Sequence, residues 1–252
     1  MSIESVNNKI IKQIVSLGDK KARDESGLFV VEGKKQVSEI PGDWTVEYFV
    51  ASQDNNMPGG AKTYLVSQDI IRKISDTDTP QGILAVVHKK HYDMQEVLKS
   101  ERGLFLLLDT IQDPGNLGTI IRTAHAYGVK GVFISKNSVD VFSPKVVRAT
   151  MGSVFKIPLF QECSAEQVMA EFIKKSIKTY ALSITANMYV SDTKFADKTA
   201  LIIGNESKGI GDAVLKAADY CVKIKMLSDI DSLNAAVACS IALYEASGQI
   251  SF

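Results

Sequence analysis

Apolar runs and polar segments alternate differently in the two parts of the chain. In the first part, up to about residue 90, the apolar runs are short, and they predict strands at 27–33, 45–52, 62–67 and 82–88. An amphipathic helix is predicted before them by the spacing of Ile10, Ile14 and Leu17. A turn is expected at 54–61, and the polar stretch 88–103 is a candidate linker. We therefore expect a small α/β domain over residues 1–95.

The second part is more regular. Its apolar runs predict buried strands at 103–109, 131–135, 179–184, 200–204 and 220–226. Helical patterns lie between or after these runs, at 117–127, 144–151, 164–177, 212–218 and 232–247. Strands that alternate with helices predict a mostly parallel sheet with both faces covered. We expect this α/β domain to occupy residues 96–252.

Three polar loops follow predicted strands, at 109–118, 204–211 and 226–234. Ligands of parallel sheets bind at the carboxyl ends of the strands, where such loops meet. The loop 204–211 reads GNESKGIG, which lacks the lysine and serine or threonine of a P-loop and the order of a G-x-G-x-x-G fingerprint. Glu206 would also repel a pyrophosphate. The loop therefore favours an uncharged or cationic nucleoside-like ligand.

Composition narrows the possible classes further. The formal net charge is zero, so a nucleic-acid surface has to be a local patch. Apolar runs stay short of the roughly 20 residues of a membrane helix, and the N-terminal sequence lacks a secretory pattern. The three cysteines lack framework spacing, which favours reduced thiols in the cytoplasm. The three histidines form no metal-binding motif, so no metal is expected.

The three loops and their flanks resemble a known set of motifs. The segments are LDTIQDPGNLGTIIRTAHAYGV, LIIGNESKGI and KIKMLSDIDSLNAAVACSIALYE. In this order they closely resemble the three motifs of the SpoU/TrmH family of RNA ribose 2′-O-methyltransferases, within the SPOUT class. The resemblance covers roughly residues 104–248, and SPKVVRATMGSVFKIPLF looks like the linking segment of that family. Residues 28–88 resemble more weakly its small RNA-binding domain, mainly through FVVEGKKQV.

The resemblance implies a fold, a cofactor and partners. It implies S-adenosylmethionine as methyl donor and a homodimer with the active site at the subunit interface. It also implies a deep trefoil knot, whereas the general rule against knots would have given an ordinary doubly wound sheet. RNA is the implied substrate, and the FVVEG segment favours ribosomal RNA, for rRNA processing, over transfer RNA.

The motif match also implies roles for individual residues. Arg122 is placed near the 2′-hydroxyl; because its guanidinium stays protonated, binding the RNA phosphate or stabilising a developing alkoxide suits it better than general-base work. Asn116 would orient Arg122 or the ribose. Glu206 would accept a hydrogen bond from a guanidinium, with Arg122 as the candidate donor. Ser232 and Asn234 would shape the ribose and cofactor contacts.

Two further groups of residues are expected to bind ligands. The cofactor-binding positions implied by the motifs are Gly204, Asn205, Ile224, Met226 and Leu233. The cations expected at RNA phosphates are Lys145 and Arg148 first, and then Lys20, Lys21 and Arg23.

Each residue also has a purely structural interpretation. Asn116 and Ser232 could be helix N-caps, Arg122 and Glu206 could be solvated, and a buried Asn234 would need hydrogen-bond partners of any kind. The alanine-rich helix over 235–246 could pack in a core or in a dimer interface. We expect the interface, with Leu243 and Tyr244 as its larger contacts.

Two other functions compete with methyl transfer. A non-catalytic RNA-binding protein of the same fold would not need all five polar motif residues. A nicotinamide-dependent oxidoreductase would need the fingerprint that the chain lacks. The sequence leaves open the target nucleotide, and a housekeeping or a resistance role.

Overall fold

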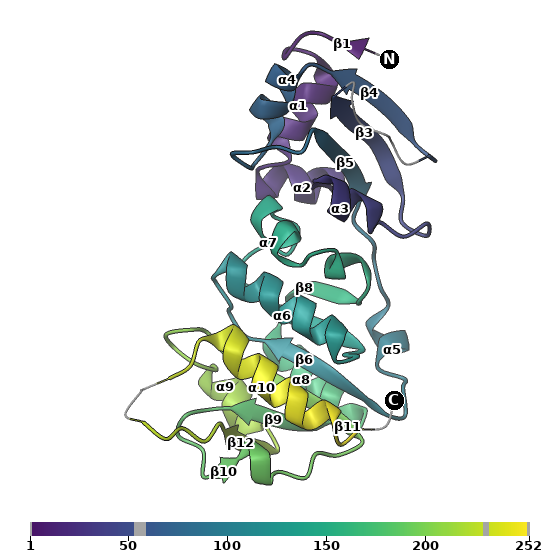
Figure 1. Cartoon of the computed structure of the whole chain (residues 1–252). Helices are drawn as coiled ribbons and strands as arrows, with labels where there is room; N and C mark the ends of the chain where they lie inside the picture. The colour runs from purple at the N-terminus through teal and green to yellow at the C-terminus, as the bar shows by residue number, and fades with distance from the viewer. Residues whose placement is uncertain (1, 53–58, 229–231, 251–252) are drawn as a thin grey trace. The chain divides into compact units, whose positions relative to one another are not determined.

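The computed structural model describes residues 2–52, 59–228 and 232–250. These residues form two compact units, which are drawn in Figure 1. Unit 1 consists of residues 1–91 and 140–155, and unit 2 of residues 92–139 and 156–252. Most of the expected turn at 54–61 lies outside the described residues.

Unit 1 is built on a mixed sheet. In its described part the strand order is β1-β4-β3-β5-β2. The strands are β1 Ser2–Ile3, β2 Leu28–Glu32, β3 Val46–Ser52, β4 Lys62–Val66 and β5 Ile83–His88. The antiparallel strand β5 lies between β2 and β3, while β3, β4 and β1 are parallel. Four of these strands were predicted, and the two-residue β1 was not.

Two helices pack their apolar side chains in the core of unit 1, and only the first of them was predicted. Helix α1, Lys9–Ser16, buries Ile11 and Ile14, and α4, Gln68–Ile74, packs in the same core. Asn8 and Ser67 cap these helices by accepting from Ile10 N and Ile70 N. The other short helices of the N-terminal segment are α2 Lys20–Ser26 and α3 Lys34–Ser38.

A segment from the middle of the chain completes unit 1. It contains α7, Pro144–Ala149, and a 3-10 turn, Ser153–Phe155. Phe142 lies 4.8 Å from Phe29 between ring centroids, and Phe155 lies edge-on to Trp44 at 5.0 Å. Aromatic packing of this kind holds residues 140–155 on the sheet of unit 1.

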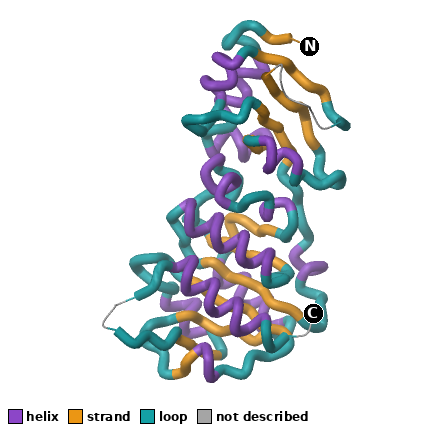
Figure 2. The backbone as a smooth tube through the Cα atoms, viewed as in Figure 1, coloured by secondary structure: helices purple, strands orange, loops and turns teal. Residues whose placement is uncertain are grey.

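Unit 2 is built on a parallel sheet, visible as orange strands in Figure 2. Its described strands have the order β10-β12-β9-β11-β6-β7-β8, and each pairing is parallel. They are β6 Gly103–Leu108, β7 Gly131–Ser135, β8 Leu159–Cys163, β9 Lys178–Leu182, β10 Met188–Tyr189, β11 Lys198–Ile203 and β12 Tyr220–Lys223. Strand β8 was missed because its residues are only half buried, and β10 because it is two residues long.

Helices cover both faces of the parallel sheet, as the sequence predicts. The helices of unit 2 are α5 Met94–Val97, α6 Pro114–Ala126, α8 Ala165–Lys174, α9 Asp212–Ala217 and α10 Ala235–Ser247, with a 3-10 turn at Val190–Asp192. Helices α8 and α9 share one core with Phe105 and Phe133, while α10 packs on α6 and β11. Within the described residues, no helix has both the length and the apolar character needed to cross a membrane.

Helix α10 corrects one expectation. Its alanine-rich face is buried within the chain itself: Leu243 has no exposed surface, and Cys239 and Ala242 are equally buried. The reason is that small side chains allow α10 to approach α6 closely. Leu243 is therefore a core residue, and the expectation that it supplies a dimer contact is wrong. Tyr244 points away from this face and is 63% exposed.

Candidate active site at the carboxyl ends of the strands

The loop after β6 is fixed by its own carboxylates. Asp109, which is buried, accepts hydrogen bonds from Gly211 N at 2.8 Å and from the Ser135 hydroxyl at 3.2 Å. Asp113 is the N-cap of α6 and accepts from Asn116 N at 2.7 Å. Asn116 therefore lies in the first turn of the helix and is not its cap, and its side chain is available for other partners.

The loop after β11 is closed on itself. Asn205 and Gly209 exchange two backbone hydrogen bonds of 2.9 and 3.0 Å. The Asn205 side chain accepts from Ser207 N and Lys208 N and donates to Thr110 O at 2.8 Å. A Cβ atom on Gly204 would lie 2.3 Å from the carbonyl carbon of Gly209, which no side chain permits. Glycine at position 204 allows the two ends of the loop to come into contact, which explains why a glycine follows the apolar run of β11.

A chain of side-chain hydrogen bonds connects the three motif loops. Asn234 Nδ2 donates to Asn116 Oδ1 at 2.8 Å, and Asn116 Nδ2 donates to Glu206 Oε1 at 2.9 Å. The other end of Asn234 caps α10, because its Oδ1 accepts from Ala236 N and Val237 N. One residue from each motif thus takes part, and Asn116, which is 8% exposed, is the central member. Motif spacing alone did not predict these pairings.

Glu206 is held as a carboxylate by its neighbours. Burial by itself would raise its pKa, but hydrogen bonds from Asn116 and from the backbone amides of Asp113 and Gln112 outweigh it and lower the pKa. The predicted hydrogen bond from Arg122 to Glu206 does not occur among the described residues. Arg122 is exposed on α6. The hydrogen bond to Glu206 that we expected from Arg122 is donated by Asn116 instead.

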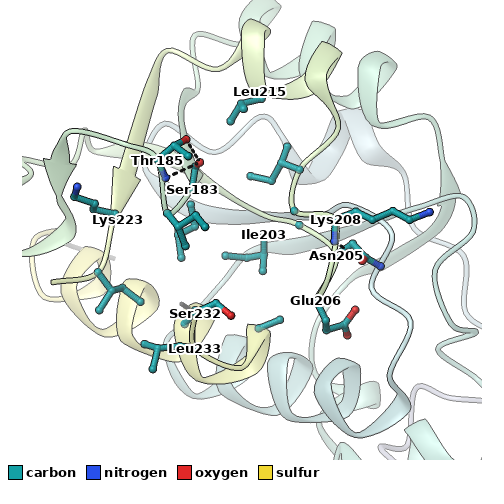
Figure 3. Close-up of a pocket in the computed structure, with 18 of the residues that line it drawn as sticks. Ser183, Thr185, Ile203, Asn205, Glu206, Lys208, Leu215, Lys223, Ser232 and Leu233 are labelled. Carbon is teal, nitrogen blue, oxygen red and sulfur yellow. Dashed lines mark hydrogen bonds between the residues drawn. The ribbon is translucent and has the colours of Figure 1, made fainter. Parts of the chain in front are cut away.

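A cavity of about 590 Å³ lies beside these loops in unit 2. Figure 3 shows Glu206 and Lys208 on one side of it and Ser183, Thr185 and Lys223 on the other. All the expected cofactor-binding residues line it: Gly204, Asn205, Ile224, Met226 and Leu233. The structure thus brings together positions that are about 30 residues apart in the sequence.

The five residues expected to be catalytic divide into two sets. Glu206 and Ser232 line the cavity. Asn116 and Asn234 are linked to Glu206 by hydrogen bonds outside the lining, and Arg122 is exposed on α6. Asn234, rather than Ser232, is the N-cap of the last helix, which therefore begins at Ala235.

The segment after β9 also contributes to the cavity and was missed by sequence reasoning. Leu182, Ser183, Ile184 and Thr185 line it, and the Ser183 and Thr185 hydroxyls lie 2.9 Å apart. The available signal was the polar stretch that directly follows the predicted strand at 179–184. Because parallel strands end at one edge of the sheet, every loop at that edge is a candidate.

The cations expected to bind RNA phosphates have different environments in unit 1. Arg23 is 3% exposed; its guanidinium contacts Asp140 at 2.5 Å and donates to Leu17 O and Gly18 O. Its expected role at a phosphate is therefore wrong, because all of its donors face protein. Lys145 is exposed, and Arg148 is partly buried beside Asp76.

Lys20 and Lys21 are exposed on α2. Lys21 lies 3.9 Å from Glu25, a distance at which a solvated pair contributes little. Both lysines remain accessible to a polyanion.

Two family models match this chain, one over its C-terminal part and one over its N-terminal part. Residues 103–244 match the family model described as the SpoU rRNA Methylase family, and this range is more than half of the chain. The chain belongs to the SpoU rRNA methylase family. Residues 8–85 match the model described as an MRM3-like substrate binding domain.

Relatives of this SpoU family member align over almost their whole length. One is the 23S rRNA (guanosine(2553)-2′-O)-methyltransferase RlmP of Bacillus subtilis, which is 32% identical, with 98% of this chain and 99% of the relative covered. Another is the 23S rRNA (uridine(2479)-2′-O)-methyltransferase of Streptomyces viridochromogenes, 29% identical, with 97% and 91% covered.

Solved structures agree with the sequence relatives. The SpoU methyltransferase AviRb of S. viridochromogenes in complex with AdoMet superposes with a TM-score of 0.89, at 28% identity, with 96% of this chain and 98% of that one covered. An AdoMet-bound rRNA methyltransferase of Sinorhizobium meliloti gives 0.87 at 29% identity, with 100% and 99% covered.

Proposed function

We propose that this SpoU family member transfers a methyl group from S-adenosylmethionine to a ribose 2′-hydroxyl of ribosomal RNA. The observation that carries the proposal is the hydrogen-bonded chain Asn234–Asn116–Glu206, which joins all three motif loops beside a cavity of cofactor size. A protein that had lost catalysis would not need this connection. The names of the aligned relatives support the same reaction on 23S rRNA.

The cavity fits S-adenosylmethionine better than a nucleotide phosphate. Its volume of about 590 Å³ lies within the range of about 300 to 1,000 Å³ for small-molecule sites. Gly204 leaves backbone groups accessible, while Ile203, Ile210 and Leu233 supply apolar walls. Glu206 is a carboxylate at one side, which attracts a sulfonium cation and repels phosphate.

When bound, the donor would supply an electrophilic methyl group to the ribose 2′-oxygen, whose proton would pass to solvent. Arg122 is the group we assign to the RNA side of this step. Its permanently charged guanidinium would hold the adjacent phosphate or stabilise negative charge on the ribose oxygen. Glu206 and Asn116 would keep the first and second motif loops in register while the ribose is oriented.

The recognition of RNA is proposed for unit 1. Its N-terminal segment matches a substrate binding domain, which is in line with an RNA-recognition role for residues 1–95. Lys145, Lys20 and Lys21 are exposed cations of this unit, suited to phosphates. Residues 140–155 pack with this unit as well, so the recognition surface includes part of the expected catalytic segment.

Three further properties belong to the same proposal: a homodimer, a trefoil knot in the parallel-sheet domain, and a cytoplasmic location. For the dimer, Val237 and Tyr244 are exposed on α10, at 48% and 63%, and Tyr127 of α6 lies edge-on to Tyr244. An exposed apolar surface on two packed helices suits contact with a second copy. Sedimentation of Tyr244→Glu tests it: the variant should dissociate at concentrations where the native chain is dimeric.

A tritium-transfer assay tests the reaction. The native chain and Arg122→Ala are incubated with labelled S-adenosylmethionine and total RNA from a strain lacking this protein. Label in one ribosomal RNA, in a dinucleotide that resists alkali, supports ribose methylation. Label in transfer RNA would overturn the substrate class. No label on either RNA or assembled ribosomal subunits, together with cofactor binding by calorimetry, would indicate a non-catalytic RNA-binding protein.

A further inference from the structure

Unit 1 contains a second cavity, of about 160 Å³, which the sequence motifs did not predict. Its apolar walls come from α1, β2 and α4, through Val15, Val30 and Ile74. Its polar side is formed by Lys73, Asp76 and Arg148. Apolar walls with a few polar groups at one side are typical of small-molecule sites.

Arg148 is the polar group with unused hydrogen-bonding capacity. Its side chain is 25% exposed, and its buried Nη1 lies 2.5 Å from Asp76 Oδ2. Nη1 is thus engaged by the Asp76 carboxylate. The ion pair holds one edge of the guanidinium in place, and the rest of this partly exposed group lines the cavity. Gln36 fixes the backbone beneath it by donating to Arg148 O at 3.2 Å.

The loop that carries Asp76 is rigidly held from below. Glu32, which is 8% exposed, accepts hydrogen bonds from the Ser75 hydroxyl, from Asp76 N at 3.0 Å and from the Thr77 hydroxyl at 2.7 Å. These three bonds fix residues 75–77 on the Glu32 carboxylate. A cavity with a fixed rim binds a ligand with a small loss of conformational entropy.

The size of the cavity and the lysines near it indicate its ligand. Its volume equals that of about five water molecules, which is below the usual range of cofactor sites but enough for one planar ring system. Lys73 lies at the rim, and Lys145 is exposed on α7 beside Arg148. A base inserted here would therefore bring its flanking phosphates near cations.

We propose that this cavity receives one unpaired nucleobase of the RNA substrate. Arg148 would donate to acceptor atoms on the edge of the base, and the aliphatic walls would pack against its faces. This inference rests on the proposed function, because it names the part of the protein that chooses the RNA position.

A pair of tryptophan variants tests the cavity. Val15 is 57% exposed at its wall, so Val15→Trp fills the space without disturbing the core. Val6→Trp is the matched control, because Val6 is an exposed apolar residue of the same unit that does not line the cavity. In the tritium assay, Val15→Trp should lower kcat/KM for RNA by about 5- to 150-fold, the range for loss of one packed base. Cofactor affinity by calorimetry should stay unchanged in both variants.

Photo-crosslinking identifies the contact directly. Ribosomal RNA containing 6-thioguanosine or 4-thiouridine is crosslinked to the native chain and to both variants. The expected product joins one thiobase to a peptide containing Val15 or Arg148, and it should disappear in Val15→Trp alone. If the native chain methylates RNA and Val15→Trp equals Val6→Trp in rate and crosslink, the cavity holds only water and this inference fails. If the native chain methylates no RNA, the proposed function fails as well.

Discussion

The two cavities differ in how the sequence encodes them. The cavity of unit 2 is formed by the loops that follow the neighbouring strands β12, β9 and β11 of one parallel sheet. Most of its lining residues lie in short continuous segments of the sequence. The cavity of unit 1 is formed by side chains from separated segments, near residues 15, 30, 75 and 148. A backbone-built site leaves a readable pattern of glycines and polar loop residues, whereas a site built from distant side chains does not.

Two arginines that were both expected to contact RNA have opposite environments. Arg122 was chosen because of its place in a motif, and the structure leaves it exposed on α6. Arg23 was chosen because it lies in a basic run, and the structure buries it against Asp140. A cluster of basic residues in the sequence does not indicate which of them is exposed to solvent, because an acid far along the chain can form a buried ion pair with one of them.

The largest expected effect concerns the stability of unit 1. Asp140→Ala removes the partner of Arg23 and leaves a buried charge without compensation, which should cost about 3 to 5 kcal/mol. Urea unfolding followed by fluorescence of Trp44, the single tryptophan, measures this in unit 1. Glu25→Ala, which removes an exposed pair with Lys21, should cost less than about 1 kcal/mol. Equal losses in the two variants would show that Arg23 is solvated after all.

The next effect concerns catalysis in unit 2. Arg122→Ala should reduce methyl transfer by about 10²- to 10³-fold, as expected for loss of one group that stabilises the transition state. Cofactor affinity should remain the same, because Arg122 does not line the cavity. Single-turnover transfer and calorimetry measure the two quantities, with Arg72→Ala, an exposed arginine of α4, as control. Near-normal turnover would remove Arg122 from the reaction.

A smaller effect is expected at the cofactor loop. Gly204→Ala places a Cβ atom against the Gly209 backbone, so the loop must open at a cost of about 1 to 3 kcal/mol. Cofactor affinity should fall accordingly, by about 5- to 150-fold, when measured by calorimetry. Gly42→Ala is the matched control in unit 1, because a Cβ atom there meets nothing within 4 Å. Unchanged affinity in Gly204→Ala would refute the assignment of the loop to the cofactor.

The smallest effect is a pH dependence. Glu206 has a lowered pKa in the folded state, so its contribution to stability is complete at neutral pH and is lost as the pH falls through that folded pKa. The melting-temperature difference between the native chain and Glu206→Gln should therefore shrink below about pH 4. Since Glu206 is exposed, the difference should correspond to less than about 1 kcal/mol. A difference that grows on acidification would contradict the assigned hydrogen bonds.

Most strands of both units, and the helices α1 and α6 to α10, were predictable because apolar periodicity records which faces are buried, whereas the short helices α2 to α5 were not predicted. The exceptions have physical reasons. Strand β8 is only partly buried, and the last helix begins at Ala235 because Asn234 takes the cap that Ser232 was also suited to take. Likewise, Leu243 looked available for a partner, since periodicity does not say which surface covers an apolar residue.

The sequence by itself determined the parallel sheet and the three polar loops, and it named five residues that the structure places around one cavity, because local patterns and short motifs are written in consecutive residues. Only the tertiary structure decided that Asn116 would bind Glu206, that Arg23 would be buried by Asp140, and that α7 would complete unit 1. Each of these contacts joins residues roughly 90 or more positions apart. Such pairings depend on how whole elements pack, and packing is a property of all the residues together.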